Sequence, residues 1–148
     1  MTRVLVDTNV FLYSRGRDHG YREPCRAILR TAAAGAVRLE ASVEVVQELT
    51  HVLMRRGVDR VSAVAQAQEV SAQCLLHAFD EDVLARALAL VAEHSTLGMR
   101  DAVHAATALG ADLVQVVSAD HVFDRIEGIT RVDPRDPGAP WNRSSSTT

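Results

Sequence analysis

Short apolar runs alternate along the chain with longer segments in which apolar residues recur every three or four positions. The runs have the length of buried strands and lie at residues 4–6, 37–41, 74–79, 113–117 and 129–132. The longer segments are typical of helices and lie at residues 25–34, 43–56, 60–73, 81–94 and 100–109. Strands that alternate with helices of this length predict an α/β fold, a three-layer α/β/α sandwich around a central parallel sheet.

Residues with strong end preferences support these helix boundaries. Ser42, Asp59 and Asp80 each stand directly before a predicted helix, where a short polar side chain accepts a hydrogen bond from a free backbone N–H. Gly35 and Gly57 each follow a predicted helix, where glycine tolerates the left-handed conformation that ends it. Residues 9–13 predict a turn or the start of a further helix, which leaves the polar segment after them as a loop.

The composition is that of an ordinary globular domain, with 148 residues, 47% apolar residues and a net charge of −3. We expect one folded domain over residues 1–133 and a flexible C-terminal tail over residues 134–148. Three of the four prolines and a polar run lie in this tail, so we also expect Trp141 to be disordered. No basic leader with a long apolar run stands at the N-terminus, so we expect a cytoplasmic protein without a membrane segment.

All 16 basic residues are arginine. The absence of lysine excludes Schiff-base chemistry and the phosphate-binding lysine of a P-loop. It also argues against a receiver-type signalling domain and a haloacid-dehalogenase-like phosphatase, since both need a lysine near their reactive aspartate. The six histidines and two cysteines do not show the spacing of a zinc site.

Two acidic residues follow predicted strands. Asp7 comes directly after the run VLV, and Asp120 lies three residues after LVQVV, in VVSAD. Burying a carboxylate is unfavourable unless it is compensated. Because open parallel sheets bind their ligands beyond the carboxyl ends of the strands, this placement predicts either a helix cap or a functional site.

Two further acids lie on predicted helices. Glu48 borders the apolar stripe of the helix over residues 43–56, and Asp101 lies in the first turn of the helix over residues 100–109. Each acid alone has an ordinary interpretation as a cap, a turn residue or a solvated side chain. Together they suggest one acidic pocket. Two carboxylates about 4 Å apart repel by about 4 kcal/mol at an effective dielectric constant of about 20, so a cation would be needed.

An all-oxygen ligand set suits a hard ion, Mg²⁺ or Mn²⁺. Such ions serve phosphoryl chemistry by activating a water and neutralising the phosphate and the leaving oxygen. The four acids therefore favour hydrolysis of a phosphate ester.

The segments that contain these acids resemble, in order, the four acidic motifs of PIN-domain nucleases: LVDTNVFLY, VVQEL, GMRDAVHAATAL and VVSADHVFDRI. The resemblance covers residues 3–133 and is strongest to the VapC toxins of VapBC toxin–antitoxin pairs. It implies an α/β/α fold, Mg²⁺ or Mn²⁺ in an acidic pocket, and endoribonuclease activity. Carried over by motif, the catalytic and metal-binding residues are Asp7, Glu48, Asp101 and Asp120.

The same resemblance implies partners. A VapB-type antitoxin should hold the toxin, with an arginine offered to the acids, and the toxin should form a homodimer. One position departs from the pattern, because relatives often carry a second acid where this chain has Val122. Asp124, two residues further on, could substitute through a water or face solvent, and we expect it to face solvent. This departure keeps an alternative open, a catalytically weak or inactive PIN-fold module that binds RNA or protein.

Smaller roles are expected around the acids. Thr8 and Asn9 could hydrogen-bond a ligand carboxylate or a bound water, and Ser118 offers a hydroxyl near Asp120. His104, one helical turn after Asp101, is expected to pack between helices.

RNA binding by a chain of net charge −3 requires local basic residues, because phosphate contacts dominate the affinity. The predicted loop over residues 14–24 carries basic and aromatic side chains, and Tyr13 precedes it. We expect these to form an RNA-binding rim that favours structured RNA with an exposed single-stranded loop. The rim residues are Arg15, Arg17 and Arg22, with Tyr13 and Tyr21 as stacking surfaces.

Overall fold

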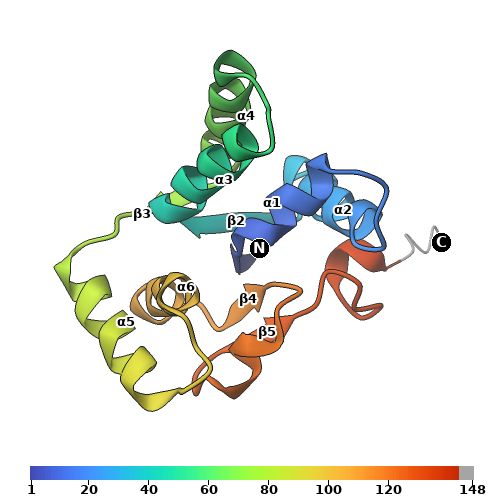
Figure 1. Ribbon diagram of the computed structural model, residues 1–148. Coiled ribbons are helices and arrows are strands. Elements are labelled where there is room, and N and C mark those ends of the chain that lie inside the picture. The colour runs from blue at the N-terminus through green and yellow to red at the C-terminus, as the bar shows by residue number, and fades with distance from the viewer. Residues whose placement is uncertain (144–148) are drawn as a thin grey trace.

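The computed structural model describes residues 1–143 and contains a parallel sheet of five strands in the order β3-β2-β1-β4-β5 (Figure 1). The strands are β1 (Thr2–Val6), β2 (Val37–Ser42), β3 (Leu75–His77), β4 (Gln115–Val117) and β5 (Thr130–Val132). The α-helices are α1 (Thr8–Arg15), α2 (Arg22–Ala33), α3 (Val43–Arg55), α4 (Arg60–Gln73), α5 (Glu81–Glu93) and α6 (Met99–Gly110). Two 3₁₀ helices follow, η1 (His121–Arg125) and η2 (Pro140–Asn142). Within residues 1–143, no helix has the length and apolar character needed to cross a membrane.

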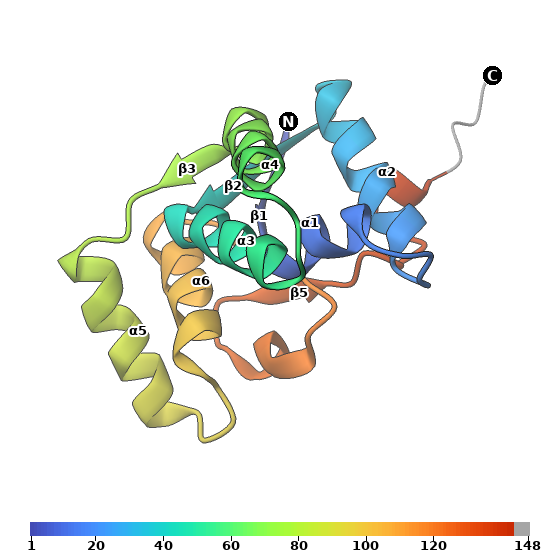
Figure 2. The same cartoon turned by 45° about the horizontal axis from the view of Figure 1, so that its top comes forward.

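Helices cover both faces of the sheet, as the sequence predicts. Val4 and Val6 of β1 pack in a core with α1, α2, α3 and α4, whereas Leu5 between them packs with α5, α6 and η1. This alternation follows from the pleat of a strand, which directs successive side chains to opposite faces. The predicted three-layer α/β/α sandwich is confirmed (Figure 2).

The central strand β1 lies at the point where the order of the strands reverses. The chain passes from β1 to β2 on one side, and β4 pairs with β1 on the other, with Leu5 opposite Val116 and Val6 opposite Val117. The backbone N–H of Asp7 continues this pairing by donating to the carbonyl of Val117 at 3.0 Å. The residues after β1 and β4 therefore meet at one edge of the sheet, the usual location of a ligand site in this architecture.

Most predicted elements are present, with shifted ends. The predicted turn over residues 9–13 is part of α1, which begins at Thr8 and continues to Arg15. The predicted loop over residues 14–24 is shorter, because α2 begins at Arg22. Pro24 is accommodated there since it lies in the first turn, where backbone N–H groups have no partner within the helix.

The segment after β5 differs from the expected flexible tail. Trp141 is only 7% exposed and packs in the core beside α2, and its indole N–H donates to the carbonyl of Pro134 at 2.9 Å. The Asn142 amide donates to the same carbonyl at 2.7 Å. The expectation of disorder is wrong for residues 134–143, because one buried indole removes a large apolar area from water. Residues 144–148 of the expected tail lie outside the described residues.

A charged side chain is buried in the sheet. The carboxylate of Glu40 on β2 is fully buried, and it accepts hydrogen bonds from Arg3 Nη2 at 3.0 Å and from His77 Nε2 at 2.8 Å. Burial by itself would raise the pKa of Glu40, but the hydrogen bonds from Arg3 and His77 and the nearby charge of Arg38 outweigh it and hold the pKa below its ordinary value. This cluster connects β1, β2 and β3 across the sheet.

We predict that Glu40→Gln lowers the free energy of unfolding by about 2 kcal/mol at pH 7, because it leaves Arg3 without its buried counter-charge. A folded-state pKa below the unfolded value means that the stabilisation is present above pH 4.5 and is lost as the pH falls through the folded pKa. The difference between variant and wild type should therefore shrink toward pH 3. Urea unfolding at pH 7 and at pH 3 measures this difference, with Glu127→Gln at an exposed glutamate as the control. An equal difference at the two pH values would show that the charge of Glu40 is not the stabilising feature.

Candidate acidic site

Asp7 is buried at the junction of β1 and α1, where it caps the helix. Its carboxylate Oδ1 accepts the backbone N–H of Thr8 at 2.7 Å. The other oxygen, Oδ2, accepts from the hydroxyl of Ser118 at 2.7 Å and from the side-chain amide of Asn9 at 3.1 Å. The residue is only 4% exposed. A carboxylate is tolerated at the end of a buried strand here because three donors, two of them side chains, surround it.

Glu48 reaches the same site from α3. The hydroxyl of Thr8 donates to Glu48 Oε2 at 2.8 Å, so adjacent residues at the start of α1 hold two different acids. The nearby imidazole of His104 is the main cause that lowers the pKa of Glu48 below its ordinary value. Burial opposes this effect, and the Thr8 hydrogen bond and the charge of Arg100 add to it.

His104 lies between these two acids. Its Nε2 atom is 3.7 Å from Asp7 Oδ1 and 3.7 Å from Glu48 Oε2, and the side chain is 2% exposed. Burial alone would lower the pKa of His104, but the neighbouring carboxylates of Glu48, Asp7 and Asp101 raise it. As expected, His104 is buried where α6 packs, and it also lies beside two acids. Its position one turn after Asp101, on the same face of α6, is the sequence signal for this contact.

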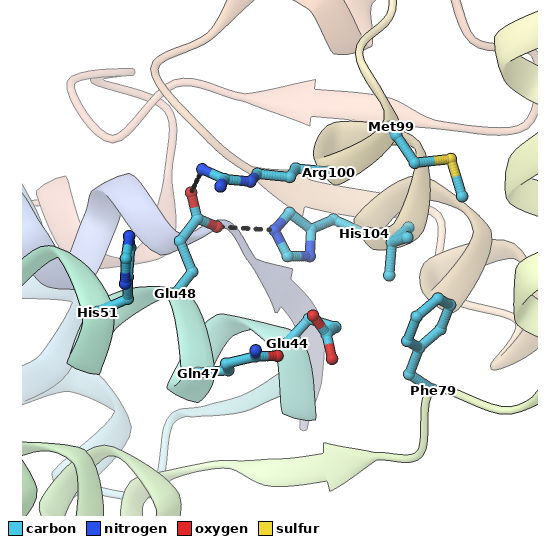
Figure 3. A pocket seen from close by; sticks show the side chains of 9 residues that line it. Glu44, Gln47, Glu48, His51, Phe79, Met99, Arg100 and His104 are labelled. Carbon is cyan, nitrogen blue, oxygen red and sulfur yellow. Dashed lines mark ion pairs between the residues drawn. The ribbon is translucent and has the colours of Figure 1, made fainter.

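Arg100 is a second site residue that the sequence analysis did not identify. Its Nη1 atom lies 3.7 Å from Glu48 Oε1, and its side chain is 76% exposed (Figure 3). No spacing rule links Arg100 on α6 to Glu48 on α3, because only the packing of these helices brings them together.

Asp101 lies half-buried in the first turn of α6. Burial and the negative charges of Asp7 and Asp120 raise its pKa to about 6, against the opposing charge of His104. Burial also raises the pKa of Asp7, and the charge of His104 and the hydrogen bonds from Ser118 and Thr8 only partly compensate. The carboxylates thus lie close enough to disfavour one another's ionised form.

Asp120 is the most exposed of the four acids. Its Oδ1 atom accepts the backbone N–H of Val122 at 3.0 Å and caps η1, and its own N–H donates to the Ser118 hydroxyl at 3.0 Å. Ser118 thereby connects Asp120 with Asp7. Asp120 therefore lies at the edge of the acidic site and is also a helix cap, the ordinary interpretation that the sequence allows for it.

Asp124 lines a shallow pocket together with Asp120. It is exposed and forms an ion pair with Arg131 at 2.7 Å and a hydrogen bond with His121 at 2.9 Å. The hydrogen bond from Arg131 leads the effects that hold the pKa of Asp124 below its ordinary value. As expected, this acid faces solvent, and its carboxylate is engaged by Arg131 and His121.

The donor chemistry of this site fits a hard divalent cation. All four acids offer oxygen, and the side-chain oxygen of Asn9 is buried without a hydrogen-bond partner in the described chain. Within residues 1–143, no three Asp, Glu, His or Cys side chains are already close enough together to hold one ion. An ion would have to draw the mutually repelling carboxylates together, with Asp7, Glu48, Asp101 and Asp120 as the available ligands.

Both the sequence and the fold are similar to those of known proteins. The PIN domain family matches residues 4–129. The chain is 32% identical over 133 residues to Ribonuclease VapC7 of Mycobacterium tuberculosis, an alignment that covers 88% of this chain and 91% of the relative. Its fold is similar to that of VapBC2 from Rickettsia felis, a structure with a DNA fragment from the promoter, at a TM-score of 0.69 and 14% identity over 89% of this chain and 98% of that chain. It is also similar to VapC20 of M. tuberculosis, a toxin that cleaves the sarcin–ricin loop, at a TM-score of 0.66 and 18% identity over 80% and 90% of the two chains.

We predict that Asp101→Asn stabilises the protein by about 1 kcal/mol at pH 7.5 in EDTA, because it removes a half-buried charge that other acids repel. The gain should shrink below pH 6, where the wild-type carboxyl with its pKa of about 6 becomes protonated in the folded state. Asp82→Asn, at an exposed acid in the first turn of α5, is the matched control for the loss of a helix-dipole interaction. Urea unfolding measures both variants, and an Asp101→Asn protein less stable than wild type would refute this electrostatic picture.

Proposed function

This chain belongs to the PIN-domain family, within it to the VapC ribonucleases, and we propose that it is a Mg²⁺- or Mn²⁺-dependent endoribonuclease, the toxin of a type II VapBC pair. The observation that supports this proposal is the convergence of acids from four separate segments at the carboxyl edge of β1 and β4. These acids are Asp7, Glu48, Asp101 and Asp120.

A bound divalent ion would neutralise the phosphate and lower the pKa of a water. Asp7 and Asp101 would be its direct ligands, with Glu48 and Asp120 acting through water or at a second ion. Ser118 and Asn9 orient the Asp7 carboxylate through the hydrogen bonds described above. Because these groups are already ordered, little reorganisation is needed when a phosphate arrives.

Thr8 and His104 position the carboxylate of Glu48. The hydroxyl of Thr8 holds one oxygen of Glu48, and the imidazole of His104 lies between Glu48 and Asp7. A cationic imidazole at this position offsets part of the negative charge, which allows the two carboxylates to lie near each other. Arg100, exposed at the edge of the site, is placed to contact a backbone phosphate of the substrate.

The alternative is a PIN-fold module that binds RNA or protein with weak or absent catalysis. The specific observation in its favour is the last motif, where Val122 replaces an acid and Asp124 pairs with Arg131. The ordered hydrogen bonds around Asp7 favour the nuclease, since a module that only binds has no need for a buried carboxylate with three donors.

The proposed substrate is structured RNA with an exposed loop, and the site of action is the cytoplasm. VapC20, which shares the fold, is described as cleaving the sarcin–ricin loop. We also propose a VapB-type antitoxin as partner and a homodimer as the working assembly, since the R. felis relative is a VapBC protein.

The proposed RNA rim lies at the opposite end of α1 from Asp7. Arg17 is exposed, whereas Arg15 is mostly buried and donates to the Phe11 carbonyl at 3.4 Å. Tyr21 stacks with other rings of the loop, and the guanidinium of Arg135 lies 4.1 Å from its ring centroid. Arg17 is therefore the rim residue freest to contact phosphate, and Arg15 and Arg22 would act mainly by shaping the loop.

We predict that Asp7→Asn abolishes RNA cleavage, a loss of about 100-fold or more, while the fold is retained. Asparagine is as good an N-cap as aspartate, so α1 should persist. The measurement is cleavage of total RNA with Mn²⁺, with Mg²⁺ and with EDTA, together with circular dichroism of each variant. Asp82→Asn should cleave like wild type, and cleavage that continues in EDTA would exclude the metal-dependent mechanism.

We predict that Arg17→Ala weakens RNA binding and lowers the slope of log affinity against log salt by about 1, because one phosphate contact is lost. Binding is measured in the Asp7→Asn background, so that the RNA stays intact. Arg86→Ala, at an exposed arginine of α5, serves as the control for the loss of one positive charge. An unchanged slope for Arg17→Ala would remove this loop from the RNA-binding surface.

A further inference from the structure

A pocket of about 330 Å³ lies beside the acidic site (Figure 3). It is bounded by α3, by the start of α6 and by the segment that leads from β3 to α5. Glu48 and His104, which belong to the acidic site, also line this pocket. Whatever occupies it therefore lies next to the phosphate that the acids would act on.

The polar wall of the pocket is formed by α3. Glu44 and Gln47 lie side by side on this helix, and the Gln47 amide, with its nitrogen facing Glu44, donates to both carboxylate oxygens at 2.9 and 3.1 Å. Each of these oxygens keeps a free lone pair, so Glu44 presents two adjacent acceptors. His104 lines the pocket from α6, and its Nδ1 atom is buried without a hydrogen-bond partner in the described chain.

The opposite side of the pocket is apolar. Phe79 is 38% exposed and Met99 is 36% exposed, both unusually accessible for large apolar side chains next to a site. An aromatic ring and a thioether form a surface on which a flat group can stack. A pocket with this surface on one side and a pair of acceptors on the other suits a planar molecule with N–H donors along one edge.

The charges of the pocket discriminate among possible occupants. Glu44 and Glu48 would repel a phosphate group. The charge of Glu48 is partly compensated by Arg100 and His104, and both carboxylate oxygens of Glu44 already accept from the neutral Gln47 amide. A neutral nucleobase satisfies the remaining acceptors at the least electrostatic cost.

We propose that this pocket receives an unpaired guanine of the substrate RNA, in the nucleotide next to the bond that is cut. Among the four RNA bases, guanine offers two adjacent donors to one carboxylate, N1–H and the 2-amino group, and Glu44 would accept both. The ring would stack against Phe79, and the phosphate of this nucleotide would lie toward the exposed guanidinium of Arg100. This inference rests on the proposed ribonuclease function and adds a base preference to it.

The test is a titration of the full-length protein with each of the four nucleoside 5′-monophosphates in EDTA, followed by NMR. The Met99 methyl group and the Gln47 side-chain amide report occupation of the pocket. GMP should bind about tenfold more tightly than AMP, CMP or UMP, as expected for a bidentate contact with one base edge. Since EDTA stops cleavage, the result does not depend on catalysis.

Two variants distinguish the contribution of the Glu44 carboxylate from that of the Phe79 ring. Glu44→Gln should remove the preference for GMP, because an amide presents only one acceptor, while the weak binding of the other three nucleotides persists. Phe79→Ala should weaken all four nucleotides together. Glu93→Gln, at an exposed glutamate near the end of α5, should leave every affinity unchanged.

Equal binding of all four nucleotides, or no shift of Met99 and Gln47, would overturn the proposal. It would also fail if a capped arginine shifted these resonances and GMP did not, because the pocket would then accept a cationic side chain. RNA cleavage without GMP preference would reject the guanine pocket alone. GMP preference without any RNA cleavage would instead reject the nuclease function and leave a nucleotide-binding pocket.

Discussion

The hydrogen-bonded carboxylate of Asp7 is the interaction on which the arrangement of this protein depends. It ends the central strand, caps the helix that follows, and accepts from a serine on the neighbouring strand's loop. The cap is local, but the contact with Ser118 exists only if β1 pairs with β4 in the observed register. In a medium of low effective dielectric, loss of any donor would leave a buried charge poorly compensated. The same contacts therefore define the strand register and the geometry of the acids.

Two of the other acids are connected to Asp7 through shared hydrogen-bonding neighbours. Glu48 is connected to it through Thr8 and His104, and Asp120 through Ser118. Asp101 is not connected in this way, and burial together with the charges of Asp7 and Asp120 raises its pKa to about 6. The protein thus keeps a local excess of negative charge at one edge of the sheet. Sites that must bind a cation or a phosphate often retain unfavourable charges of this kind.

The main elements and the acids could be predicted because their signals are local. A strand that runs into Asp7, a serine before α3 and the acid in the first turn of α6 are each visible within a few residues of sequence. The roles of Arg100 and Glu40 could not be predicted in this way, because their partners lie on other elements and depend on helix and strand packing. For His104, the position one turn after Asp101 is visible in the sequence, but its approach to Glu48 on α3 is not. Trp141 was misjudged for the same reason, since the prolines around it indicate turns but not the surface that buries the ring.

The order of the strands has a consequence for synthesis of the chain. The first strand made is the central one, and the serine that donates to Asp7 lies 111 residues later, after β4. A nascent chain emerges from the ribosome N-terminal end first, so Asp7 leaves the ribosome long before its partner exists. Until β4 has been translated and has paired with β1, the acids have no common edge on which to assemble. A nascent chain that has not yet reached β4 therefore carries Asp7 and Glu48 without a formed site.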